Sequence, residues 1–216
     1  HVGYVESGEI KVGEIATLSV DENQRGLTCK NHSATHLLQK ALKTVLGGHV
    51  EQAGSYVAQD RLRFDFTHFA ALTADELDKV ENEVNRVILS GTPVETKEMP
   101  IEEAKAMGAM ALFGEKYGDT VRVIQYGDSI ELCGGTHVEA TGNIGFFKII
   151  SEGAVAAGIR RIEATTGAHA EELLYTVEDL VAQVKSYFNN TPNLTGSIKK
   201  LIADKKKKKK DAEAFM

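Results

Sequence analysis

Three histidines and one cysteine have the residue types and the spacing of a metal site divided between two parts of the chain. His32 and His36 lie four positions apart, and so do Cys133 and His137. Imidazole nitrogen and thiolate sulfur are ligands that zinc prefers, and four of them complete a tetrahedral shell. A single histidine or cysteine more often packs or hydrogen-bonds without a metal. The two pairs together nevertheless predict one shared site, with Zn²⁺ as its cofactor.

The first pair is expected on a helix and the second in a tight loop. Asn31 can cap the helix and Gly47 can end it, and between them apolar residues recur at helical spacing: Leu37, Leu38, Ala41, Leu42, Val45 and Leu46. Positions i and i+4 share one helix face, so both imidazoles can reach the same ion near the predicted start of the helix. Residues 133–137 have the sequence Cys-Gly-Gly-Thr-His, in which two glycines indicate a turn after a strand. Only tertiary structure can bring these distant segments together.

The elements around these segments predict an α+β fold. Thr73 begins a capping box whose helix ends near Gly91, Pro100 begins a shorter helix, and helical periodicity resumes at about Ala168. Strands are expected within residues 2–20 and at 56–58, 62–66, 121–126, 129–132, 145–150 and 159–165. Because strands and helices do not alternate strictly, we expect a mixed or antiparallel sheet with packed helices rather than a doubly wound sheet.

Three domains follow from this order of elements. Residues 1–22 are expected to be the last strands of a small β domain or barrel remnant, and residues 23–167 the domain that holds the metal site. Residues 168–216 are expected to form a helical extension, either a hairpin or the start of a longer coiled segment. The chain opens with His1 rather than methionine, which indicates a piece cut from a longer polypeptide.

The composition is that of a soluble globular protein. The 216 residues are 42% hydrophobic and 26% charged, and neither a membrane-spanning run nor a signal peptide is present in the sequence. The only cysteines are Cys29 and Cys133, and since one belongs to the metal set, a disulfide framework is not expected. These properties predict a cytoplasmic location.

The charge pattern leaves nucleic-acid binding open. A net charge of −6 argues against a generally basic surface. A local basic patch could still form from Arg25, Lys30, Lys40, Lys43, Arg61, Arg63, Arg160 and Arg161, or these residues could simply be dispersed solubilising charges. Six consecutive lysines, residues 205–210, could contact RNA phosphate or form a solvated helix face.

Two zinc-enzyme classes are disfavoured by the residues next to the ligands. A zinc peptidase would carry a glutamate immediately after the first histidine, but Ser33, Ala34 and Thr35 fill the interval here. A zinc deaminase would carry His-x-Glu and Cys-x-x-Cys, and the sequence has neither.

Five ordered blocks of the sequence resemble the editing domain of alanyl-tRNA synthetase. These blocks are residues 31–38, 48–55, 62–66, 133–138 and 158–163. The resemblance covers about residues 20–167, and the helical tail is similar to the region that follows editing in that enzyme. The aminoacylation core would lie outside this chain, and the parent enzyme would self-associate mostly through other regions.

The resemblance implies an aminoacyl-tRNA hydrolase that removes serine or glycine from mischarged tRNA(Ala). His32, His36, Cys133 and His137 match the zinc ligands of that family, and Thr35 and Gln52 match positions that line its amino-acid pocket. We expect Thr35, Gln52 and Cys133 to be catalytic, and Thr35, Gln52, Ser55 and Arg63 to bind substrate. A site that hydrogen-bonds a serine hydroxyl can discriminate by roughly 10⁴ against alanine, which lacks it. Zinc could orient the aminoacyl group or activate a water molecule.

Three other interpretations fit the same motifs. A freestanding trans-editing deacylase would contain every block. Threonyl-tRNA synthetase has a related editing domain, but its loop resembles Cys-x-Gly-Pro-His. Alternatively, the chain could be a non-catalytic tRNA-binding module in which zinc only locks the helix to the loop.

Overall fold

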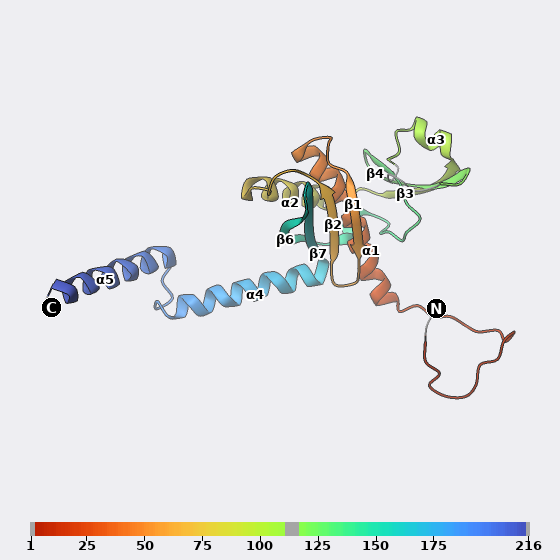
Figure 1. Ribbon diagram of the computed structural model, residues 1–216. Coiled ribbons are helices and arrows are strands. Elements are labelled where there is room, and N and C mark those ends of the chain that lie inside the picture. The colour runs from red at the N-terminus through yellow and green to blue at the C-terminus, as the bar shows by residue number, and fades with distance from the viewer. Residues whose placement is uncertain (1–2, 111–116, 215–216) are drawn as a thin grey trace.

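The computed structural model describes residues 3–110 and 117–214, which form helices and two antiparallel sheets (Figure 1). The helices are α1 (Glu22–Leu46), α2 (Ala74–Leu89), α3 (Ile101–Ala106), α4 (Gly167–Ser186), α5 (Leu194–Ala214) and a short 3₁₀ turn, η1 (Thr141–Ile144). The strands are β1 (Gln52–Val57), β2 (Leu62–Thr67), β3 (Val94–Pro100), β4 (Thr120–Tyr126), β5 (Ser129–Leu132), β6 (Phe147–Ala156) and β7 (Ile159–Thr166). The larger sheet has the order β1-β2-β7-β6, and the smaller sheet has the order β3-β4-β5.

This architecture confirms the α+β class and makes both sheets antiparallel. Within the described ranges neither sheet closes into a barrel. The structure adds a strand that the sequence analysis missed, β3, which lies at an edge of the smaller sheet, is mostly exposed and has charged residues at three of its seven positions. Figure 1 shows that the smaller sheet and α3 lie on one side of α1, away from the helical extension.

The prediction of strands within residues 2–20 is wrong for residues 3–20, the part of this segment that the structure describes. This segment pairs with no strand, and its apolar side chains, such as Val12 and Ile15, are almost fully exposed. Alternation of apolar and polar residues favours extended backbone, but a strand also requires a partner for its N–H and C=O groups. Residue 2 lies outside the described residues.

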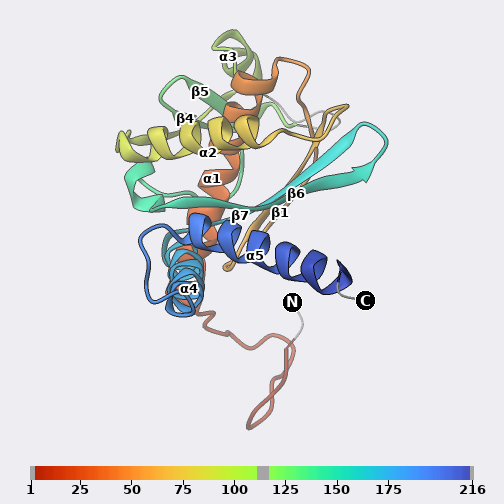
Figure 2. The ribbon, with the colours of Figure 1, turned by 90° about the vertical axis from the view of Figure 1, so that its left-hand side faces the viewer.

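The main core lies between the larger sheet and two helices. Alternate residues of β2, namely Leu62, Phe64 and Phe66, are completely buried, because successive side chains of a strand point to opposite faces. They share one hydrophobic cluster with apolar residues of α1, α2 and β7. Figure 2 shows α2 crossing α1 beside this sheet. The packing fixes α1, and with it the histidine pair, against the sheet.

Helix α1 begins earlier than the sequence analysis expected, so Asn31 is not its N-cap. Asp21 caps the helix, and its side chain accepts a hydrogen bond from the backbone N–H of Gln24 at 3.0 Å. Asn31 is buried inside the helix, where its amide donates to the carbonyl of Ala58 at 2.8 Å and accepts from the hydroxyl of Thr166 at 2.8 Å. These tertiary bonds replace the local capping bond, and the histidine pair therefore lies in the middle of a long helix.

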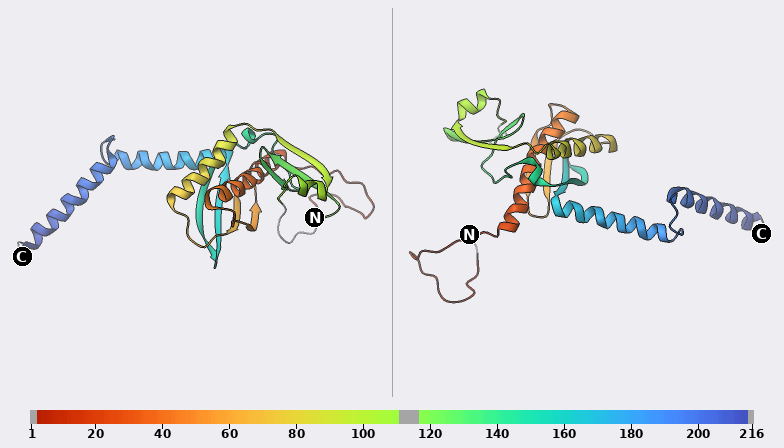
Figure 3. Two further views of the ribbon diagram at one scale, coloured as in Figure 1. Left: turned by 90° about the horizontal axis from the view of Figure 1, so that it is seen from above. Right: turned by 180° about the vertical axis from the view of Figure 1, so that it is seen from behind.

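The other helix boundaries follow local signals. Thr73 and Glu76 form the expected capping box at the start of α2, and Gly47 ends α1 with a positive φ of 114°. Helices α4 and α5 project from the body one after the other and do not fold into a hairpin (Figures 1 and 3). No helix in the described part of the chain is long and apolar enough to cross a membrane.

An ion pair joins the two central strands of the larger sheet on the face opposite the core. Asp65 of β2 lies opposite Arg161 of β7, and the guanidinium donates to both carboxylate oxygens, at 2.6 and 2.7 Å. These hydrogen bonds, aided by attraction to Arg161 and Arg63 and opposed by burial, lower the pKa of Asp65. The pair therefore contributes stability only while Asp65 is ionised.

We expect Asp65→Asn to lower the free energy of unfolding at pH 7 by about 1–2 kcal/mol, since a partly exposed bidentate pair is lost. The folded-state pKa lies below the unfolded value of about 3.9, so this contribution is complete above the unfolded pKa and disappears as pH falls through the folded pKa. Urea unfolding from pH 7 down to pH 2.5 should show the two proteins converging in acid.

The exposed residue Asp75 provides the control, because it also pairs with a cation, Lys79. Asp75→Asn should change the unfolding free energy by less than about 0.5 kcal/mol. A constant deficit of Asp65→Asn across the whole pH range would contradict the proposed role of the ion pair.

Candidate metal centre and adjoining cavity

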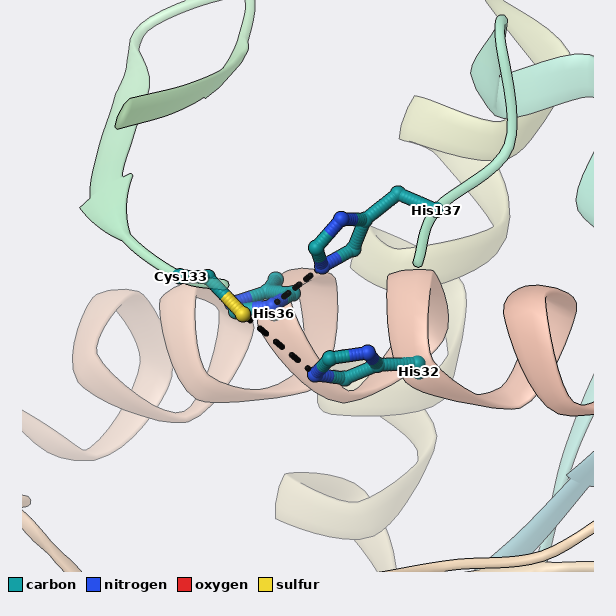
Figure 4. Close-up of side chains that lie close together, drawn as sticks. All are labelled: His32, His36, Cys133 and His137. Atoms are coloured by element: carbon teal, nitrogen blue, oxygen red, sulfur yellow. Dashed lines mark hydrogen bonds between the residues drawn. The ribbon is translucent and has the colours of Figure 1, made fainter. Parts of the chain in front are cut away.

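The structure brings the four expected metal ligands together (Figure 4). One ligand atom from each of His32, His36, Cys133 and His137 lies within 4.8 Å of all the others. The Nε2 atoms of His36 and His137 are 3.1 Å apart, and the Cys133 Sγ is 3.5 Å from the Nε2 of His32. The two halves, which are far apart in the sequence, therefore form a single cluster.

The helix half of the cluster is fixed by the core packing of α1, and the loop half by hydrogen bonds. Arg122 of β4 donates to the carbonyl oxygens of Cys133 at 2.9 Å and Gly135 at 2.5 Å. The backbone N–H of Val138 donates to the Ser33 hydroxyl on α1 at 3.0 Å. These bonds hold the loop over the helix face that carries the histidines.

The loop approaches the helix so closely that a side chain at one position would displace a histidine. A Cβ atom added at Gly135 would overlap the His32 ring where it now lies, whereas one added at Gly134 would meet nothing within 4 Å. The two glycines of the motif thus have different roles. Gly135 permits close approach of the loop to His32, and Gly134 faces open space.

The cluster changes the protonation of its own members. Burial alone would raise the pKa of Cys133, but hydrogen bonds from His137, His32 and His36 lower it to about 3. Burial would lower the pKa of His36, but hydrogen bonds to Cys133 and Glu131 raise it to about 9. Burial, supported by the neighbouring imidazoles, lowers the pKa of His137. Cys133 and His137 are therefore in their ligating forms at neutral pH, whereas His36 must release a proton to bind a metal.

The donor set and its spacing fit a zinc ion. Zinc bond lengths and a tetrahedral angle place neighbouring ligand atoms about 3.3 Å apart for two nitrogens and about 3.6 Å apart for nitrogen and sulfur. The Nε2–Nε2 separation of His36 and His137 and the Sγ–Nε2 separation of Cys133 and His32 are near these values. The four ligand atoms therefore have a spacing that one zinc ion could bridge.

Sequence analysis missed two residues that contact the cluster. Glu131 of β5 is 4% exposed, and its Oε2 lies 2.5 Å from the Nδ1 of His36. Tyr126 of β4 is also buried and stacks on the His36 ring at 5.6 Å. A glutamate between Ile130 and Leu132 in a short strand just before the cysteine was a signal for the first, because buried charges require partners. No local signal identified the tyrosine.

A cavity of about 190 Å³ adjoins the cluster and contains three of the predicted substrate-binding residues. It has room for about six water molecules or a small aminoacyl group. The walls come from α1, β1, β5 and Met110, and the lining residues are His32, Thr35, His36, Gln39, Gln52, Ser55, Met110, Glu131, Leu132 and Cys133. A larger cavity of about 320 Å³ between α1, α2 and the β4–β5 turn contains none of the four ligands. Volume alone therefore does not locate the metal site.

Arg63 is the predicted substrate-binding residue that does not line this cavity. Its guanidinium lies over the Tyr56 ring, 5.7 Å from the ring centre, and its Nε is 3.9 Å from Asp65. These contacts place it on the face of the sheet opposite the core. Its role in substrate binding stays a prediction.

Comparison with known proteins identifies the class of domain. A family model described as the threonyl and alanyl tRNA synthetase second additional domain matches residues 121–163, which contain Cys133 and His137 but not the first histidine pair. The matched segment runs from β4 into β7 and includes the loop half of the His₃Cys cluster, so this part of the chain is similar to that synthetase domain.

Full-length relatives define the family more narrowly. Alanine–tRNA ligase of Bacteroides fragilis is 59% identical over 198 residues, which is 91% of this chain and 23% of the relative. The corresponding ligase of Lysinibacillus sphaericus is 50% identical over 217 residues, which is 100% of this chain and 24% of the relative. This chain belongs to the alanyl-tRNA synthetase family and corresponds to its editing-domain region, and it spans about a quarter of the length of these relatives.

We expect Gly135→Ala to weaken zinc binding at least tenfold, because the new methyl group would displace the His32 ring from the cluster. Gly134→Ala is the matched control, and its zinc affinity should stay within about twofold of the unsubstituted chain, a change of about 0.4 kcal/mol. Competition with a chromophoric chelator would measure both dissociation constants. Equal affinities of the two variants would show that the close approach of the loop does not matter for the metal.

Proposed function

We propose that this chain is the editing part of an alanyl-tRNA synthetase and that it hydrolyses the ester bond of tRNA(Ala) mischarged with serine or glycine. The observation that supports this most directly is the shared wall between the metal cluster and the small cavity. His32, His36 and Cys133 face the same space as Thr35, Gln52 and Ser55. An aminoacyl group in this cavity would place its ester beside a bound metal and its side chain among hydroxyl and amide groups.

Serine recognition can be assigned to Thr35 and Gln52. The Thr35 hydroxyl donates to the carbonyl of Asn31 at 2.8 Å, so its oxygen remains available as an acceptor. A serine hydroxyl could donate to that oxygen, and the Gln52 amide can both donate and accept. Alanine would leave these groups unpaired, which a buried site penalises strongly. Glycine would leave them unpaired as well, so these bonds account for the serine substrate alone.

The reaction itself requires little covalent chemistry from the chain. A water oxygen attacks the ester carbonyl carbon, the bond between that carbon and the ribose oxygen breaks, and a proton from the water passes to the ribose oxygen, which becomes a hydroxyl. A zinc ion held by His32, His36, Cys133 and His137 would supply Lewis acidity at this position. Cys133 contributes a thiolate ligand, and the apolar groups of Met110 and Leu132 limit the space open to water.

The domain division supports the same function. Residues 23–167 would be the hydrolytic domain, and residues 168–216 a helical extension beyond it. In this proposal the partner is the tRNA acceptor end, which must reach the cavity lined by α1, β1 and β5. The lysines at 205–210 lie exposed on α5, and whether they touch RNA is a separate question from the chemistry at the cluster.

A structural role for zinc is the second candidate function. Four protein ligands already complete a tetrahedral shell, as in structural zinc sites, whereas catalytic sites usually keep one position open. In that case the metal would only lock the loop to α1, and the chain would be a tRNA-binding module. The adjoining cavity favours hydrolysis, and an assay of ester cleavage distinguishes the two functions.

We expect the zinc-loaded chain to release serine from seryl-tRNA(Ala) and to spare alanyl-tRNA(Ala). Cys133→Ala should abolish release because the metal shell loses its only thiolate. Thr35→Val should lower serine release roughly 10- to 100-fold, corresponding to one or two lost hydrogen bonds at about 1.4 kcal/mol each. Release of labelled amino acid from the precharged tRNA measures these rates.

Thr44→Val is the matched control for Thr35→Val. Thr44 lies on the same helix and makes the same hydroxyl bond to the carbonyl four residues earlier, at 2.9 Å, but it does not line the cavity. Its serine release should equal that of the unsubstituted chain. A folded, zinc-loaded chain that releases no serine above the spontaneous rate would favour the structural role of zinc.

A further inference from the structure

We propose that Glu131 is the positioning residue of the metal centre: its carboxylate fixes the His36 ring so that Nε2 faces the other three ligands. The inference rests on the zinc site of the proposed function and adds a residue that the ligand motifs do not contain. It concerns metal binding, so it can be tested separately from ester hydrolysis.

The contact between Glu131 and His36 is short and almost dry. The Oε2 of Glu131 lies 2.5 Å from the Nδ1 of His36, and the two side chains are only 6% and 10% exposed. An ionised carboxylate has no proton to donate and can only accept this hydrogen bond. The Nδ1 of the imidazole must therefore carry a proton. The lone pair for metal binding is then on Nε2, which is the atom 3.1 Å from the Nε2 of His137.

The carboxylate is itself held in place by its strand. Ser129, two residues earlier on the same face of β5, donates its hydroxyl to the other oxygen of Glu131 at 3.2 Å. Glu131 is paired with Ile124 of β4. Ser129 is paired with Tyr126, at the end of the hairpin where the chain turns. The Tyr126 ring stacks on His36 from this hairpin. One hairpin therefore supplies both the hydrogen bond and the stacking surface that orient this ring.

Charge balance gives Glu131 a second reason to be buried there. One thiolate and three neutral imidazoles leave a bound zinc ion with a single positive charge. A buried carboxylate is costly when it has no cationic partner, and the metal centre would provide one. Carboxylate–histidine–zinc arrangements of this kind orient the ligand and increase its basicity. Among the described residues, the corresponding Nδ1 of His137 has no such partner, so the support falls on His36.

The test compares zinc affinities of Glu131→Ala and Glu131→Gln by chelator competition. We expect about 10- to 100-fold weaker binding for the alanine variant and a smaller loss for glutamine, which keeps the shape and one acceptor but not the charge. Glu81→Gln is the control, because Glu81 is also largely buried and accepts bonds from Lys148 and the backbone of Ile149, far from the cluster. Its zinc affinity should be unchanged.

A spectroscopic readout separates positioning from general stability. Cobalt bound in place of zinc should show shifted ligand-field bands in Glu131→Ala and unchanged bands in Glu81→Gln. If Glu131 only holds β5 to α1, both Glu131 variants would melt earlier without metal, yet retain the zinc affinity and cobalt spectrum of the unsubstituted chain, which overturns the proposal. If the alanine variant does not fold, the isosteric glutamine variant decides. Zinc binding without serine release would overturn the proposed hydrolysis and leave this inference intact.

Discussion

The arrangement of the four candidate metal ligands depends on how closely the loop at residues 133–137 lies against the middle of α1. The helix is fixed by the main core, which it shares with α2 and the larger sheet. The loop is fixed by the smaller sheet, whose strand β4 has residues in both hydrophobic clusters: Ile124 in the main core, and Val123 in a cluster with α3. Because β4 belongs to both clusters, packing alone brings Cys133 to the histidines. A bound metal ion would then only have to fix the final positions of the four side chains.

The same close approach concentrates polar groups in a dry place. Three imidazoles, a thiol and a glutamate lie within one small volume, and they come from α1, from β5 and from the loop that follows β5. Burying these polar side chains together costs free energy unless their charges compensate one another. The opposite shifts in the pKa of Cys133 and His36 show this compensation within the protein chain itself. A bound divalent cation would extend it.

The parts of this structure that the sequence predicts are those set by local chemistry. The ligand types, the capping box at Thr73 and the glycine loop were visible because each needs particular residues at particular spacings. The prediction of Asn31 as the N-cap was wrong because its side chain bonds instead to Ala58, in the turn between β1 and β2, and to Thr166, at the end of β7. The prediction of strands at residues 3–20 was wrong because alternating apolar and polar residues cannot show whether a partner strand exists. Strand β3 and residue Glu131 were missed because charged residues usually mark surface, and only tertiary structure shows which charge is buried.

Asn31 also joins parts of the chain that are separate in sequence. Its side chain bonds the turn between β1 and β2 and, through the Thr166 hydroxyl, the last residue before α4. At the same junction the backbone N–H of Gly167 donates to the carbonyl of Phe146 at 2.8 Å, so the first turn of α4 is anchored to the body. The start of the projecting helix α4 and the helix that carries the histidines are thus both held by Asn31, the residue immediately before His32. Force applied to the extension by a bound partner would be transmitted to the metal centre through a few hydrogen bonds.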